Sequence, residues 1–317
     1  SYFCNEHLIQ VHMTREKWQG HIAILMTNVI FGLNTPIAKT LVPEWIHPFA
    51  LTLVRMSCAT LIFWSISLFL PREKVSFKDL TILFFAALFG LIGAQLSFAV
   101  ALQYSSPVNI SLIAAMTPVI VMLMAAMFLK EPITGKKATG VFIGACGALL
   151  LILQSTPAGG GSNHTLGTLL CIVNIVTYAT YLIITRTISR RYSPVTLMKW
   201  MFLFAALVAL PLGLDKLGES KIFMTPVLDL NALLRLAYIV IMATGVAYLL
   251  VPIALKRIRP TTVSMYNNAQ PIIASIVAIL IGQDSFTWDK PVAALLVFLG
   301  VYLVTQSKSR ADIEKQS

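Results

Sequence analysis

The amino-acid sequence predicts an all-α integral membrane protein with ten transmembrane helices, arranged as two inverted five-helix repeats around a central cavity. Three observations lead to this fold class: an apolar composition, a series of long apolar segments, and matching residues between the two halves of the chain. Of the 317 residues, 57% are hydrophobic and only 12% are charged. Soluble domains average roughly 45–50% apolar and about 25% charged residues. A chain of this composition is therefore expected to be solvated by a bilayer.

The first half contains five apolar segments, each long enough to cross a bilayer as a helix, which takes about 20 residues. The first follows Met13–Trp18, which has the form of a natural start, so whether residues 1–12 are native is left open. Its length and the spans behind it argue against a cleaved signal peptide. Pro48 opens the second segment, Pro71 closes it and Pro107 opens the fourth, as expected of a residue that cannot donate a backbone hydrogen bond inside a helix. The expected spans are 18–40, 48–70, 80–103, 106–128 and 138–155.

The second half repeats this organisation. Pro194 and Pro260 open its second and fourth apolar segments, as Pro48 and Pro107 do in the first half. The expected spans are 167–188, 194–213, 231–255, 261–281 and 290–306. Residues 18–155 and 167–306 are thus expected to form two units of five helices, joined by a linker at 156–166.

Basic residues predict the orientation of these spans. Most of the 24 Lys and Arg residues lie in alternate loops and in the two terminal segments, and the linker 156–166 has none. Because basic residues favour cytoplasmic loops, residues 1–17 and 307–317 are predicted to be cytoplasmic tails and the linker to be non-cytoplasmic. The expected location is a bacterial inner (plasma) membrane, crossed many times. The net charge of +11 does not indicate a nucleic-acid partner, because the basic residues separate apolar runs and form no stripe.

The sequence offers no pattern for a metal site, a cofactor or an enzyme. The four cysteines are scattered, with no C-x-x-C pair and no histidine at ligand spacing. Neither H-E-x-x-H nor G-x-S-x-G occurs, so an intramembrane enzyme is disfavoured. A channel is disfavoured as well, because no segment resembles a selectivity filter. No cofactor, no metal and no catalytic residue are therefore predicted.

Matching residues in the two halves indicate a duplication. Because each half has five spans, the two copies must cross the membrane in opposite directions, and inverted repeats of this kind are typical of secondary transporters. Near the start of each half the offset is 147 residues, pairing Gly20 with Gly167 and Lys39 with Arg186. Further along, the offset is 153 residues and the pairs are Pro107 with Pro260, Ser111 with Ser264, Pro118 with Pro271, Glu131 with Asp284, Thr134 with Thr287 and Gly147 with Gly300.

Short elements in a fixed order carry a family resemblance. They are Phe31-Gly32-Leu33-Asn34, Leu53-Val54-Arg55, the stretch 101–118, Leu129-Lys130-Glu131 and the stretch 254–260. Together with the repeat, they resemble the ten-helix EamA branch of the drug/metabolite transporter superfamily, although Lys130 stands where that family commonly has glycine. The resemblance covers residues 20–306 and implies two inverted helix bundles around a cavity that carries small metabolites. It implies no particular substrate.

Polar residues inside the spans are the candidates for the cavity wall, because such residues are costly in lipid. The sharpest stripe lies in the sixth span, where residues 174, 178, 181 and 185 share one helix face. Interhelical hydrogen bonding is the alternative role for any one of these residues. The predicted substrate-binding residues, collected from this stripe and from its repeat partners, are Phe31, Asn34, Gln95, Asn174, Tyr178, Tyr181, Tyr248 and Asn267.

Two basic residues lie well inside spans. Arg55 is expected either to bind an anionic group of the substrate or to have a structural role, for which snorkelling to the surface is one form. Lys199 is close to the start of its span at Pro194, and snorkelling is the favoured interpretation. Gly140 and Gly144 form a small-residue face, which predicts close helix packing within the bundle.

The absence of acidic residues from the middle of the predicted spans limits the classes of substrate and of energy coupling. All 13 Asp and Glu residues fall in tails, loops or span ends, so no carboxylate is available mid-span for a cation or as a proton relay. The favoured function is a secondary transporter of small metabolites, most plausibly amino acids or similar neutral or zwitterionic compounds, with export as the favoured direction. A facilitator or exchanger is expected, and a nucleotide-sugar or drug transporter of the same superfamily is the alternative. The expected partners are the small-molecule substrate and the lipid bilayer, and the oligomeric state is left open, a monomer included.

Overall fold

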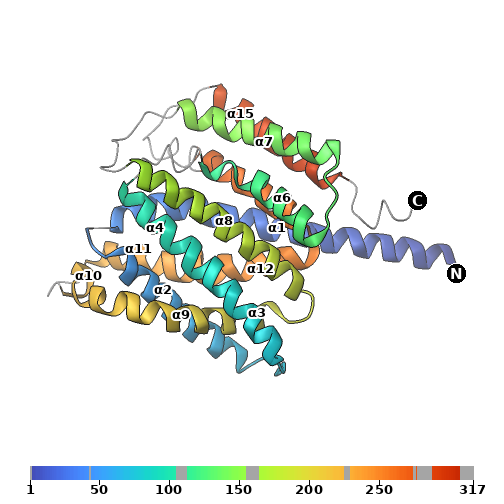
Figure 1. The fold of residues 1–317 in the computed structure, drawn as a ribbon. Coiled ribbons are helices and arrows are strands. Elements are labelled where there is room, and N and C mark those ends of the chain that lie inside the picture. Colours follow the sequence, from blue (N-terminus) through green and yellow to red (C-terminus); the bar gives the residue numbers. More distant parts are fainter. Residues whose placement is uncertain are drawn as a thin grey trace.

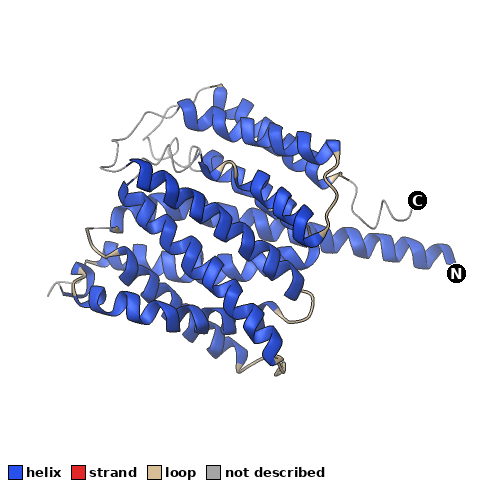
Figure 2. Cartoon of the chain, viewed as in Figure 1, coloured by secondary structure: helices blue, strands red, loops and turns tan. Residues whose placement is uncertain are grey.

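The helices of the computed structural model lie where the apolar segments predict them (Figure 1). The structure describes residues 2–42, 44–104, 113–154, 164–224, 229–273, 276 and 288–307. Within these ranges every regular element is helical, as Figure 2 shows. The elements of the first half are α1 (Tyr2–Leu41), α2 (Pro48–Ser67), α3 (Phe77–Ala87), the π-helix η1 (Leu88–Gly93), α4 (Ala94–Tyr104), α6 (Thr117–Leu129) and α7 (Gly135–Gln154).

The second half follows the same order of spans, with two short elements, α10 and η3, that have no described counterpart in the first half. After the region of the linker come α8 (His164–Ile188), α9 (Pro194–Gly218), the short α10 (Lys221–Met224), α11 (Leu230–Val240), the π-helix η2 (Ile241–Val246), α12 (Ala247–Arg257), α13 (Pro260–Met265), the 3-10 helix η3 (Tyr266–Ala269) and α15 (Asp289–Thr305). Among the described residues, six helices are long and apolar enough to cross a membrane, and α6 and the segment Pro291–Thr305 are shorter apolar helices. The predicted all-helical, multi-pass membrane fold is confirmed.

The main departure from the expected boundaries is at the start of the chain. α1 begins at Tyr2 and runs without a break through the segment expected to be a tail. Residues 2–17 contain no proline or glycine that would end a helix, so the helix continues beyond the span. The expected linker lies outside the described residues up to residue 163, and residues 308–317 of the expected C-terminal tail also lie outside them.

The repeat is visible in the helix boundaries themselves. The unit α3–η1–α4 and the unit α11–η2–α12 have the same lengths, and each boundary is displaced by 153 residues, which is also the separation of Gln95 and Tyr248. Each unit is an apolar span interrupted by one π-helical turn at the same place. Such turns shift the backbone hydrogen bonds and occur frequently at functional sites.

Helix packing follows the same symmetry. α1 packs against α12 and, equivalently, α8 packs against α4; α2 packs against α9 and α7 against α15. The loop between α2 and α3 contacts the loop between α8 and α9, where Arg191 Nη1 lies 2.8 Å from Asp79 Oδ1 and the Ser193 hydroxyl donates to Glu73 Oε2 at 3.0 Å. The loop between α1 and α2 contacts α10 instead, where Ile222 N donates to Trp45 O at 3.1 Å. Equivalent loops are therefore at opposite ends of the bundle, and the repeat is inverted.

We refer to the end that holds the loops 68–76, 130–134, 189–193 and 258–259 as the basic end. α1 begins and α15 finishes on this side of the bundle (Figure 1). In the first of these loops Glu73 is half-buried. Burial acts to raise the pKa of Glu73. The pKa is nevertheless held below its usual value by hydrogen bonds from Thr196 and Ser193 and by the charge of Lys199.

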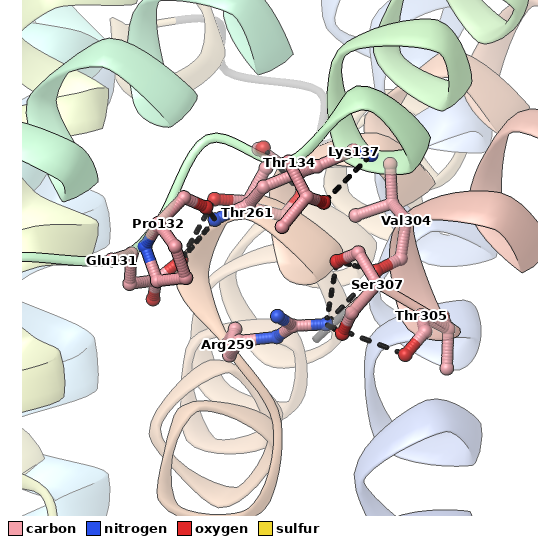
Figure 3. Close-up of polar contacts among 10 residues, drawn as sticks. Glu131, Pro132, Thr134, Lys137, Arg259, Thr261, Val304, Thr305 and Ser307 are labelled. Carbon is pink, nitrogen blue, oxygen red and sulfur yellow. Dashed lines mark hydrogen bonds and ion pairs between the residues drawn. The ribbon is translucent and has the colours of Figure 1, made fainter. Parts of the chain in front are cut away.

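Figure 3 shows a second set of contacts at the basic end, between the α6–α7 loop and the second half. Lys137 Nζ lies 2.6 Å from Glu131 Oε2, and the lysine side chain is 0% exposed. The hydroxyl of Thr261 in α13 donates to the same carboxylate oxygen at 3.3 Å. Arg259 Nη2 donates to the carbonyl of Val304 at 2.9 Å, at the end of α15. We refer to the set formed by Glu131, Lys137, Thr261 and Arg259 as the basic-end network.

The helix that precedes this network ends in an unusual conformation. Lys130 follows α6 in the left-handed region, with φ of 53°, and its backbone N–H is bonded to Ala125 O. Glycine adopts this conformation without the steric cost that a side chain adds. The lysine that departs from the expected family pattern therefore stands at a position where the backbone favours glycine.

α7 and α15 form a closely packed pair at one edge of the bundle (Figure 1). A Cβ atom added to Gly300 would lie 2.6 Å from Gly140 O and 2.7 Å from Gly144 N, so the two backbones are in contact. The predicted role of Gly140 and Gly144 in packing within the bundle is confirmed.

Candidate functional site

A cavity of about 240 Å³ lies between the two halves of the chain. Typical ligand pockets have volumes of about 300–1,000 Å³, so a cavity of this size suits a small ligand. Both halves contribute to its wall. Its polar and aromatic lining residues are Phe31, Asn34, Arg55, Gln95, Phe98, Thr117, Asn174, Tyr178, Tyr248, Asn267, Asn268 and Gln270.

The structure brings most of the predicted site residues together in this wall. The predicted residues that line the cavity are Phe31, Asn34, Gln95, Asn174, Tyr178, Tyr248 and Asn267, and the basic residue Arg55 joins them. Tyr181 and Lys199 do not line it. The predictions from helix spacing therefore converge on one place, although the residues come from five different spans.

Tyr181 lies directly behind the cavity wall. It is fully buried, and its ring centroid is 6.0 Å from that of Tyr178 and 6.3 Å from that of Tyr248. The ring packs against Gly90 in η1, where any added Cβ atom would overlap it. The equivalent position in η2 is Ala243, so the π-helical turn does not itself require glycine. Gly90 is needed for the close approach of Tyr181.

Lys199 is at the basic end. Its ammonium lies 5.3 Å from the ring centroid of Trp64, a cation–π contact, and the Trp64 indole donates to the Lys199 carbonyl at 3.2 Å. The side chain is half-buried and is close enough to Glu73 to act on its pKa. These contacts agree with the predicted snorkelling of Lys199 and not with a role in the cavity.

Three polar residues of the wall are not among the predicted site residues: Thr117, Gln270, and Asn268, which shares the polar face of the ninth span with Asn267. Asn268 lies in the 3-10 turn η3, and both polar atoms of its side chain are buried without a hydrogen-bond partner among the described residues. Asn34 Oδ1 is also buried and has no hydrogen-bond partner among the described residues. Buried polar groups are normally paired, so unpaired amides in a cavity wall are candidates for contacts with a ligand. The only signal for Thr117 and Gln270 was their polar character within apolar segments.

Two equivalent helix contacts lie on either side of the cavity. We refer to the contact of α1 with α12 as the basic-end seam, and to that of α8 with α4 as the opposite-end seam. In the opposite-end seam Asn174 Nδ2 donates to the carbonyl of Ala94 at 2.7 Å. In the basic-end seam the hydroxyl of Thr27 lies 3.4 Å from the carbonyl of Ala247.

These two contacts lie at equivalent positions in the two repeats. Thr27 and Asn174 are equivalent positions, and so are Ala247 and Ala94, the first residues after the two π-helices. Each seam joins one helix of the first half to one helix of the second. In the opposite-end seam the Asn174 amide donates across to the other half, whereas in the basic-end seam the nearer acceptor of the Thr27 hydroxyl is Ala23 O of its own helix, at 2.9 Å.

The basic-end seam is closed over its length. Beyond Thr27, a Cβ atom on Gly20 would lie 3.0 Å from the Cβ atom of Arg257. Arg186 Nη1 donates to the carbonyls of Leu255 and, at 3.0 Å, of Ile258, and so covers the end of α12. Between the cavity and this end lies a dense core that contains Ile24, Tyr181, Leu255 and Ile258. A ligand in the cavity has no route to the basic end through these described side chains.

Arg55 carries the one formal charge among the described residues that line the cavity. Its side chain is 7% exposed, and it bridges three helical elements: Nε donates to Thr244 Oγ1 and Nη1 to Gln95 Oε1, both at 2.7 Å. Gln95 Nε2 in turn donates to the hydroxyl of Tyr248. Placing arginine at the centre of a membrane helix costs about 2.5–3.5 kcal/mol on insertion scales. The guanidinium bonds residues of two other helical elements and so points into the bundle, which excludes snorkelling of Arg55 to the membrane surface.

The family comparison agrees with this architecture. A model of the EamA-like transporter family matches residues 18–153 and 165–306. The two matched ranges correspond to the two repeats, and together they cover most of the chain.

Known proteins with similar sequences include plant, archaeal and bacterial members. WAT1-related protein At3g30340 of Arabidopsis thaliana is 22% identical, over 96% of this chain and 92% of its own length. An uncharacterized transporter of Archaeoglobus fulgidus is 23% identical, over 92% of this chain and 100% of its own length. The uncharacterized transporter YyaM of Bacillus subtilis is 24% identical, over 89% of this chain and 92% of its own length.

A crystal structure with 18% sequence identity has the same fold. It superposes with a TM-score of 0.72, covering 96% of this chain and 99% of its own chain. The similarity extends through both repeats.

Proposed function

The chain belongs to the EamA-like transporter family, and on this premise we propose that it is a secondary transporter of amino acids or similar small neutral or zwitterionic compounds, with export favoured. The observation that carries the proposal is the cavity between the two repeats, which is bordered by one seam on each side. Opening the basic-end seam would expose the cavity to one side of the membrane, and opening the opposite-end seam to the other. Inverted repeats make the two motions equivalent.

The chemistry of the wall supports this class of substrate. No Asp or Glu is among the described residues of the lining, so an organic cation would find no counter-charge there. The unpaired amides of Asn34 and Asn268 suit polar groups, and the rings of Phe31, Tyr178 and Tyr248 suit an apolar part. Two of the relatives named above, from Archaeoglobus fulgidus and Bacillus subtilis, are described as transporters.

The test is counterflow in proteoliposomes without an imposed pH gradient, using the twenty amino acids in turn as radiolabelled probes. We expect at least one amino acid to exchange. The exchange should need no pH gradient, because the described cavity wall contains no Asp, Glu or His that could relay a proton. Replacing Tyr178 with Ala should lower this exchange at least tenfold. The matched control is Tyr302→Ala, in the exposed face of α15, which should exchange like the wild type.

Uptake that requires a pH gradient and collapses with an uncoupler would contradict the exchange mechanism. Equal exchange by Tyr178→Ala and Tyr302→Ala would show that the cavity is not the route.

We further propose that the basic end faces the cytoplasm of a bacterial cell, because the loops there carry the basic residues. Single cysteines at Glu44 and at Lys74 place one probe at each end, since both residues are exposed and lie in the α1–α2 and α2–α3 loops. In a variant without the native cysteines, an impermeant thiol reagent added to intact cells should label position 44, and position 74 only after permeabilisation. The reverse pattern would overturn the orientation.

A further inference from the structure

The charge of Arg55 has no partner of opposite sign among the residues that the structure describes. Its two hydrogen-bond acceptors, Thr244 Oγ1 and Gln95 Oε1, are neutral groups. The ion pairs found among the described residues are Lys137 with Glu131, Arg191 with Asp79 and Lys216 with Glu219, all away from the cavity. Buried charges in proteins are normally paired, so a buried arginine without an anion points to a missing one.

The guanidinium keeps donors free on the side of the cavity. It has five N–H groups, of which Nε and Nη1 each use one for Thr244 and Gln95. Both N–H groups of Nη2 and one of Nη1 remain without a partner among the described residues. Nη1 and Nη2 together form the planar fork that binds a carboxylate through two parallel hydrogen bonds.

A purely structural role does not account for the charge. Thr244 and Gln95 could be bridged by a neutral side chain, and the bridge would then avoid the cost of a buried ion. Comparison of the two repeats also indicates that the fold does not require this charge. α2 and α9 both begin with a proline, and the residue of α9 that corresponds to Arg55 is Met201, which is fully buried. The inverted architecture is therefore built without an arginine at this level in the second half.

The surroundings define the rest of the ligand. Tyr248, which is held by Gln95, stands beside Phe31 with ring centroids 5.7 Å apart, and Tyr178 lies in the same wall. The cavity thus has one cationic point next to aromatic surfaces. A single arginine matches one negative charge, and the neutral amides of Asn34 and Asn268 provide no second cation.

We propose that Arg55 binds the carboxylate of the transported compound, so that the substrates are small monocarboxylates, amino acids among them, with an apolar or aromatic part packed against Phe31, Tyr178 and Tyr248. This inference rests on the proposed transport function and defines which charge the substrate must carry. The carboxylate completes the coordination of Nη1 and Nη2, and the hydrogen bonds from Arg55 to Thr244 and Gln95 hold the fork in place for it.

The experiment compares ligands that differ only in the group that would face Arg55. The probes are phenylacetate, phenylacetamide and phenethylamine, with L-phenylalanine as the zwitterion, each tested as a competitor of counterflow and as a stabiliser of the purified protein. With the wild type, the two carboxylates should act at concentrations at least tenfold lower than the amide and the amine. This comparison needs no variant and so does not depend on how a mutant folds.

Two variants then assign the selectivity to the arginine. Arg55→Gln should lose the preference for phenylacetate over phenylacetamide, and Arg55→Lys, which keeps the charge but not the planar fork, should retain part of it. Retention of the preference in a folded Arg55→Gln protein would overturn the proposal. So would equal action of phenylacetamide and phenylacetate on the wild type, in which case transport itself would still stand. If the wild type neither binds nor exchanges any of the probes or the twenty amino acids, both this inference and the proposed function fail.

Discussion

Replacing Lys137 with Met is expected to destabilise the protein by about 3–5 kcal/mol, the usual cost of removing one partner from a buried ion pair. The ammonium of Lys137 is fully buried and lies 2.6 Å from Glu131 Oε2. Without it, the carboxylate keeps only the hydroxyl of Thr261 at 3.3 Å as a donor from another element. The measurement is the midpoint of thermal unfolding of the purified protein in detergent.

The adjacent lysine provides the control. Lys136 is exposed, so Lys136→Met should leave the unfolding midpoint nearly unchanged. Combining Lys137→Met with Glu131→Leu removes both charges and should recover much of the lost stability, because an apolar pair carries no desolvation cost. If Lys137→Met and Lys136→Met lower the midpoint equally, the basic-end network does not contribute as described.

The network also has a place in the transport cycle. Its Thr261–Glu131 bond connects α13 of the second half to the α6–α7 loop of the first, and Arg259 connects the start of α13 to the end of α15, at the same end as the closed basic-end seam. A stable network is therefore expected to favour the closed state of this end. Its Glu131 has Asp284 as the repeat equivalent, which lies outside the described residues.

The spans could be predicted from sequence because the physical signals are local. A bilayer fixes the length of an apolar helix, and proline marks its ends, as at Pro48, Pro194 and Pro260, where α2, α9 and α13 begin. The repeat could be predicted because paired residues kept their spacing. The structure adds that the repeat extends to the boundaries of α3, η1 and α4 and of α11, η2 and α12.

The π-helical turns could not be predicted. Leu88–Gly93 and Ile241–Val246 are apolar runs that continue the helical pattern on both sides. The helices that face the ends of these turns, with Asn174 bonded to Ala94 O and Thr27 near Ala247 O, belong to the other half of the chain in each case. That information is distributed between residues far apart in the chain.

The depth of the cavity was also beyond the sequence. Helical spacing places Tyr178 and Tyr181 on one face, but it does not say where along that face the cavity ends. The structure places Tyr178 in the wall and Tyr181 behind it, against Gly90. Arg55 illustrates the same limit, because its partners Gln95 and Thr244 come from other spans and only the fold shows that neither is acidic.

The central claim is that the two seams open in turn to expose one cavity, and disulfide cross-links test it most directly. Ala101 of α4 and the native Cys171 of α8 pack together in the opposite-end seam, so Ala101→Cys creates a pair there once the other three native cysteines have been replaced. The equivalent residues of the basic-end seam are Ile24 of α1 and Ala254 of α12, both fully buried, and Ile24→Cys with Ala254→Cys forms the matched pair.

The measurement is counterflow before and after oxidation of each pair in proteoliposomes, with the cross-linked fraction read from the same samples. The account predicts that closing either seam reduces exchange to background and that a reductant restores it to the level of the same variant before oxidation, which is the reference because Ala101 and Cys171 also line the cavity. Undiminished exchange by a fully cross-linked protein, at either seam, would contradict the account.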